Sequence, residues 1–146
     1  NSNSYSAKKK LNGFYEAHSA MNIEIDDLYV QYFVGDIHET RDFLINLSKK
    51  GLVFNSIITA DDNLAVGAIK YAKLQGISIP DELSIIGYNN SIIATCCDPE
   101  LSSIDNKLET VCKNCVSTLM NIFNGNSVPF RSLFSAELVS RETTKF

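Results

Sequence analysis

The sequence is short of several features that whole classes of protein require. Among its 146 residues, no apolar run approaches the roughly 20 residues that a membrane-spanning helix needs. The first ten residues are polar and basic with no apolar segment behind them, so we expect no secretory leader. Positive charge is also scarce. The net charge of −4 argues against a nucleic-acid-binding surface on this chain.

Metal-binding side chains are few as well, with four cysteines and two histidines that are not clustered. Cys112 and Cys115 form a C-x-x-C pair, but they lie in a segment whose apolar residues recur at helical spacing. Cys96 and Cys97 are adjacent, which is not a usual spacing for zinc ligands. We therefore expect no metal site, no disulfide framework and a reducing, cytoplasmic setting.

Common catalytic and nucleotide-binding motifs are also missing. No G-x-G-x-x-G follows any expected strand, and neither a P-loop nor a G-x-S-x-G motif occurs. The sequence thus gives no support for catalysis, and we expect neither an enzyme nor a bound cofactor.

What the sequence does contain is an alternation of helix and strand patterns. With 45% hydrophobic residues it has enough apolar side chains for a core. The helices are expected at 6–21 (with Ser6 as N-cap), 36–51, 61–76 and about 106–123, and the strands at 28–34, 56–59, 83–88 and 133–141. This order predicts an α/β fold, a mostly parallel sheet flanked by helices with right-handed crossovers.

Polar side chains follow two of these strands directly. Asp61 and Asp62 come after one strand, and Tyr88, Asn89 and Asn90 come after the next. Ligands of such sheets lie outside the carboxyl ends of the strands, so both groups are expected at one ligand-binding edge. Carboxylates and amides together suit a neutral ligand rich in hydroxyl groups, such as a sugar. The alternative is structural, because aspartate caps helices and asparagine makes turns.

A strand that ends in two acidic residues is also typical of phosphoacceptor receiver domains, in which the pair binds magnesium. That function needs a further aspartate at the end of a later strand. Here the next strand ends in Gly-Tyr-Asn-Asn, without a carboxylate. A receiver-like domain therefore stays the less favoured alternative.

Several segments together resemble a known family. The run from Ile57 to Tyr88, IITADDNLAVGAIKYAKLQGISIPDELSIIGY, is similar to the effector-binding domain of lactose-repressor (LacI) family transcription regulators. That family shows a strand, Asn-Asp, a helix with A-x-G-A, Gly-Ile-x-x-Pro and a strand that ends in Gly-Phe/Tyr-Asp-Asp. KKKLNGFYEAH upstream, and DPELSSID and ELVSRETT downstream, resemble further family segments. The resemblance spans nearly the whole chain.

The resemblance implies a periplasmic-binding-protein-like fold of two lobes with a sugar effector in the cleft between them. Effector binding would alter the affinity for operator DNA, which an N-terminal helix-turn-helix absent from this sequence would contact. Residues 1–146 would be the C-terminal part of this domain, and 106–123 would pack on a missing first lobe. Such a fragment would bind effector weakly on its own. A homodimer would form through 63–75 and 91–97.

The resemblance also assigns the site residues. Lys10 stands where the family has an effector-binding arginine, and a lysine lacks the bidentate fork of that arginine. Asp61 and Asp62 occupy the Asn-Asp positions, and Asn89 and Asn90 the Asp-Asp positions, so acid and amide are exchanged. The family's stacking aromatic would fall among Phe33, Gly35 and Ile37. The other hypothesis left open is a free-standing or periplasmic solute-binding module.

Overall fold

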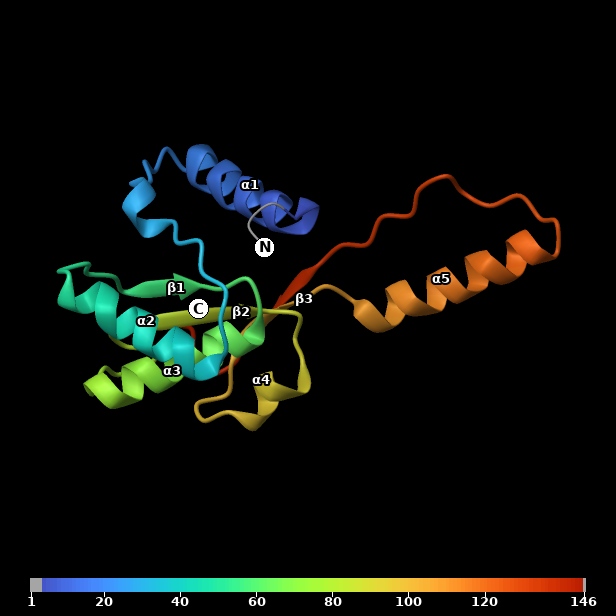
Figure 1. Ribbon diagram of the computed structural model, residues 1–146. Coiled ribbons are helices and arrows are strands. Elements are labelled where there is room, and N and C mark those ends of the chain that lie inside the picture. Colours follow the sequence, from blue (N-terminus) through green and yellow to red (C-terminus); the bar gives the residue numbers. More distant parts are fainter. Residues whose placement is uncertain (1–3, 146) are drawn as a thin grey trace.

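A four-stranded sheet in the order β1-β2-β3-β4 lies at the centre of the computed structural model, which describes residues 4–145 (Figure 1). The strands are β1 (Ser56–Ile58), β2 (Ser84–Tyr88), β3 (Ser102–Asp105) and β4 (Glu137–Val139). The first three are mutually parallel and β4 runs antiparallel to β3. The predicted α/β class with a mostly parallel sheet is confirmed.

Helices lie on both sides of this sheet. They are α1 (Tyr5–Ala20), the 3₁₀ turn η1 (Asp27–Tyr29), α2 (Ile37–Lys49), α3 (Asp62–Gln75), the short α4 (Ile92–Cys96) and α5 (Leu108–Phe123). Helix α3 packs on β1, β2 and α2, whereas α1 lies on the other side of the sheet (Figure 1). Within residues 4–145 no helix is long and apolar enough to cross a membrane.

Helix α3 lies at the centre of the core because its small side chains allow close approach. Ala65, Ala68 and Ala72 are fully buried against the sheet and α2. At Gly67 a Cβ atom would lie only 2.5 Å from the Cβ of Thr40, so α2 and α3 cross with almost no side chain between them. This tight crossing fixes α3 against α2.

Local signals set the helix ends as predicted. Asp36 and Glu39 form a reciprocal capping box at the start of α2. Asp61 caps α3 by accepting a hydrogen bond from the backbone N–H of Leu64 at 3.0 Å. Helix α3 ends at Gly76, whose φ of 69° lies in the left-handed region that favours glycine. Both termini of α3 are therefore specified locally.

The strand predicted at 28–34 is wrong. The backbone there forms the 3₁₀ turn η1 and then irregular structure, because Asp26 accepts a hydrogen bond from the N–H of Leu28 and closes a turn. The segment does not pair with the sheet, and Leu28 stays 63% exposed. A composition rich in aromatic and β-branched residues favours a strand only where a sheet edge is available.

Other boundaries shift by smaller amounts. Ser4, not Ser6, caps α1, since its side chain accepts the N–H of Ala7. Only 137–139 of the strand predicted at 133–141 pairs with the sheet. Between 88 and 106, where no helix or strand was predicted, the structure has α4 and β3. Strand β3 begins Ser102-Ser103, so it lacks the apolar pattern that identifies buried strands.

Helix α5 extends away from the sheet, together with the chain that returns from it to β4 (Figure 1). None of its residues is buried, and Phe123 is 79% exposed. Leu108, Leu119 and Ile122 of its apolar stripe are exposed as well. The stripe is thus uncovered in the described residues, and the four cysteines are free thiols.

We predict that Gly87→Ala destabilises the protein, because a Cβ at this position of β2 would lie 2.3 Å from Asp62 Oδ1 and 2.8 Å from Leu101 Cδ2. Overpacking of this kind costs about 1–3 kcal/mol, which would lower the midpoint of urea unfolding. Gly13→Ala is the matched control: its Cβ meets nothing within 4 Å on helix α1, so stability should stay level or rise slightly. Equal midpoints for both variants would contradict the packing described here.

Candidate functional site

The carboxyl ends of β1, β2 and β3 lie at one edge of the sheet, and α1 reaches over this edge. Lys10 of α1 donates a hydrogen bond from Nζ to the carbonyl oxygen of Ala60 at 2.7 Å, just after β1. The same Nζ lies 3.6 Å from the ring centroid of Tyr88, the last residue of β2. A cation over a tyrosine ring is attracted by the electrons of the ring. Lys10 therefore joins α1 to the ends of two neighbouring strands.

Asp61 stands beside Lys10 and acts on its charge. Burial lowers the pKa of the Lys10 amine, and the carboxylate of Asp61 opposes this by favouring the ammonium form. Asp61 uses Oδ1 to cap α3, and its Oδ2 accepts no hydrogen bond from the described part of the chain. The structure therefore brings together three of the predicted site residues: Lys10, Asp61 and Tyr88.

Asn89 forms the next part of this edge. Its φ of 105° is unusual for a residue other than glycine, and its backbone N–H donates to Ile104 O at 2.9 Å. The side chain is exposed, and its Oδ1 accepts a hydrogen bond from Asn106 Nδ2 at 3.2 Å. Asn89 thus holds its amide at the edge between β2 and β3.

Asn106 was not predicted from the sequence, yet it belongs to the same edge. Its Oδ1 is buried and has no hydrogen-bond partner among the residues that the structure describes. A buried acceptor of this kind favours a partner that donates a hydrogen bond. The signal that could have found Asn106 is its position directly after a strand, but β3 itself was not recognised. We call Lys10, Asp61, Tyr88, Asn89 and Asn106 the edge wall.

Asp62 lies behind the edge wall and is only 2% exposed. Its Oδ2 accepts hydrogen bonds from the backbone N–H of Ser91 at 2.7 Å and from Ser91 Oγ at 2.6 Å. Its Oδ1 accepts the hydroxyl of Ser103 at 2.6 Å. The structure therefore engages both oxygens of Asp62 within the protein, where they hold the loop after β2 against β3.

The backbone and the side chain of Asn90 also form hydrogen bonds within the protein. Its backbone N–H donates to Ser103 Oγ at 3.0 Å, and its Oδ1 accepts from Arg141 Nη2 at 2.6 Å. Arg141 in turn donates from Nη1 to Leu101 O at 2.6 Å. Sequence reasoning missed this support, because Arg141 lies 51 residues along the chain from Asn90.

Of the three positions considered for a stacking aromatic, Phe33 carries the only ring, and it packs elsewhere. Phe33 stacks on Phe43 of α2, with ring centroids 4.4 Å apart and an interplanar angle of 18°. Tyr88 is the aromatic ring of the edge wall. It already carries Lys10 over one face.

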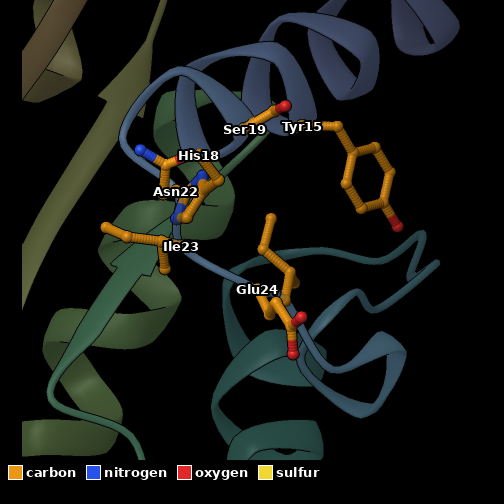
Figure 2. A pocket seen from close by; sticks show the side chains of 7 residues that line it. Tyr15, His18, Ser19, Asn22, Ile23 and Glu24 are labelled. Carbon is orange, nitrogen blue, oxygen red and sulfur yellow. The ribbon is translucent and has the colours of Figure 1, made fainter.

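A separate hollow lies at the C-terminal end of α1 (Figure 2). It is lined by Tyr15, His18, Ser19, Asn22, Ile23, Glu24 and Ile25, and it shares no lining residue with the edge wall. His18 Nδ1 is 2.8 Å from Phe14 O, so one ring nitrogen is engaged within α1. Across residues 4–145 no group of three or more His, Cys, Asp or Glu side chains could hold a metal ion.

The fold and the polar edge define the class of protein. Residues 27–144 match the model of the periplasmic binding protein-like domain family, and the chain belongs to that family. Within it, the relatives of this chain are regulators of the LacI family.

One such relative is an HTH-type transcriptional regulator of Lachnoclostridium phytofermentans, which is 46% identical over the whole of this chain. The chain spans 44% of the length of that relative. A sugar-binding transcriptional regulator of the LacI family from Escherichia coli, solved with phosphate, has a TM-score of 0.88 and 21% identity over 99% of this chain and 52% of its own. A lac repressor dimer bound to operator and the anti-inducer ONPF has a TM-score of 0.80 and 21% identity over 95% of this chain and 48% of its own. At such identity the two structures show the shared fold.

We predict that Asp62→Asn destabilises the protein by about 2–3 kcal/mol, because the amide keeps one acceptor oxygen and turns an NH₂ group toward hydroxyl and N–H donors. Chemical unfolding should show this as a lower midpoint at unchanged slope. Asp81→Asn is the control, since Asp81 forms an exposed ion pair with Lys145 that is worth at most about 1 kcal/mol. Two variants of equal stability would show that Asp62 does not hold the loop.

Proposed function

We propose that this chain is the C-terminal part of the effector-binding domain of a LacI-family transcription regulator, and that its edge wall forms one side of the cleft for a small hydroxylated effector, a sugar in the first place. The observation that carries the proposal is the convergence of Lys10, Asp61, Tyr88 and Asn89 at the carboxyl edge of a parallel sheet. This edge is where ligands of such sheets lie.

The hydrogen-bonding groups of the edge wall fit hydroxyl groups. Asp61 Oδ2 is an acceptor that a hydroxyl can donate to. The amide nitrogen of Asn89 and the ammonium of Lys10 are donors that a hydroxyl or ring oxygen can accept from. Asp62 and Asn90 act in this proposal by positioning the loop after β2, since their oxygens are bonded to Ser91, Ser103 and Arg141.

Effector binding would act by favouring one arrangement of two lobes over another. A ligand shifts such an equilibrium only by its difference in affinity for the two states. Residues 106–123 would pack on the first lobe of the full-length regulator, and the uncovered apolar stripe of α5 supports this. The function assigned is regulatory binding in the cytoplasm, with no catalytic step and no cofactor.

The full-length regulator would act on operator DNA as a homodimer. In support, the 46% identical relative is named an HTH-type transcriptional regulator. The lac repressor structure, a dimer on operator, shares the fold. The expected dimer surface at 63–75 and 91–97 includes Ile92, which is 80% exposed, and the exposed Cys96.

The effector site is tested by a thermal-shift screen of the full-length regulator with glucose, maltose, cellobiose and adenosine. At least one compound should raise the melting temperature, because ligand at 100 times its Kd stabilises the folded state by about 2.7 kcal/mol. Lys10→Ala should abolish that rise by removing a donor and the contact with Tyr88. Lys9→Ala, the next residue on α1 and a contact of Tyr5, should keep it. An equal response of the two variants would exclude Lys10 from the site.

Coupling to DNA is tested with the compound that this screen identifies. Binding of the full-length regulator to the DNA upstream of its own gene should change by about 5–150-fold on addition of the compound, the usual range of allosteric coupling. Fluorescence anisotropy at fixed salt measures this, because such affinities depend steeply on ionic strength. DNA binding that is identical with and without saturating compound would contradict the regulatory function while leaving ligand binding intact.

A further inference from the structure

The cations at the edge wall are already engaged by the protein. Lys10 is held by Ala60 O and the Tyr88 ring, and the charge of Asp61 nearby favours its ammonium form. Lys107, which follows β3, forms ion pairs with Asp105 at 3.4 Å and with Glu137. The hydrogen bond to Glu137 raises the pKa of Lys107, so this amine stays an ion-paired cation.

Arg141, which lies behind the edge wall, likewise already binds other groups of the protein. Its guanidinium donates to Leu101 O and Asn90 Oδ1, its side chain is only 13% exposed, and Glu100 Oε2 lies 3.8 Å from its Nε. A bound anion would therefore meet cations whose charge is already offset by neighbouring carboxylates: Lys10 by Asp61, Lys107 by Asp105 and Glu137, and Arg141 by Glu100.

Two helix N-termini near this edge, those of α2 and α3, already carry a carboxylate, whereas no side chain caps the start of α5, where Glu109 lies in the first turn. Backbone N–H groups at a helix start are a common anion site in α/β folds. At α3 the carboxylate of Asp61 occupies this position through the N–H of Leu64. At α2 the carboxylate of Asp36 accepts the N–H groups of His38 and Glu39 at 2.7 and 2.8 Å. Both helix starts thus already hold a negative charge.

The groups with hydrogen-bonding capacity left over favour a donor rather than an anion. Asp61 Oδ2 is a charged acceptor, and the buried Asn106 Oδ1 is a neutral acceptor without a partner in residues 4–145. A hydroxyl can donate to Asp61 Oδ2, whereas the oxygens of a phosphate would be repelled by this carboxylate.

We propose that the edge wall selects an uncharged hydroxylated ligand over its phosphorylated counterpart, and that Asp61 is the residue that sets this selectivity. The proposal rests on the proposed function, because it concerns the ligand class of the same site. It separates this chain from a regulator that senses a sugar phosphate or a nucleotide.

The test compares matched pairs on the full-length regulator: glucose with glucose 6-phosphate, cellobiose with its 6-phosphate, and adenosine with AMP. In whichever pair binds, calorimetry should give the phosphorylated member a Kd at least about ten-fold higher, the scale of one uncompensated charge contact. Equal or tighter binding of the phosphorylated member would overturn the proposal while supporting an effector site. If no compound of either kind binds the folded protein, the proposed function fails, and this inference fails with it.

The variant Asp61→Asn tests how much the charge of Asp61 contributes to this selectivity. An asparagine oxygen can still accept the N–H of Leu64 and cap α3, so the fold should be kept while the charge is lost. The Kd ratio within the pair should fall several-fold towards one. Asp81→Asn, which removes the same charge at an exposed position, should leave the ratio unchanged. A ratio that is unaltered in Asp61→Asn, or altered equally in both variants, would overturn the role of Asp61.

Discussion

The buried carboxylate of Asp62 is the interaction on which the rest of the edge depends. It belongs to the first turn of α3, yet its hydrogen bonds reach Ser91 after β2 and Ser103 in β3. Three separate chain segments are thereby fixed to one group. Gly87 makes this possible, since any side chain there would occupy the space of the carboxylate. A charge buried in this way is stable only because several donors surround it.

The neighbouring residues Asp61 and Asp62 consequently have different roles. Asp62 faces the interior and holds the loop after β2, which fixes the left-handed backbone of Asn89 and Asn90. Asp61 caps the same helix with one oxygen and has the other to spare at the edge. The start of α3 thus supplies the helix cap, the hydrogen bonds that hold the loop after β2, and one residue of the edge wall. Lys10 joins the wall from α1, on the other side of the sheet.

Features carried by neighbouring residues were predictable from the sequence, and features carried by distant ones were not. The helix start at Asp36 and the end of α3 at Gly76 depend on a few adjacent residues, and both predicted boundaries were confirmed. Strand β3 was missed because its serines are buried by partners far along the chain, such as Thr143, which accepts the N–H of Ser102. Spacing alone also could not separate Asp61 from Asp62, since adjacent residues at a helix start face different surroundings.

On the proposed function, the contacts around Asn106 and Lys107 connect the edge wall to helix α5. Asn106 lies between Asp105, the last residue of β3, and Lys107, at the start of α5. Lys107 pairs with Asp105 and with Glu137, so it joins the segment that leaves the sheet to the segment that returns. Asn106 therefore lies at the junction between β3 and α5, where its side chain contacts Asn89. On the proposed function, a ligand at the edge wall would shift α5 between two orientations only by binding one of them more tightly, since a difference in affinity is what a population shift requires.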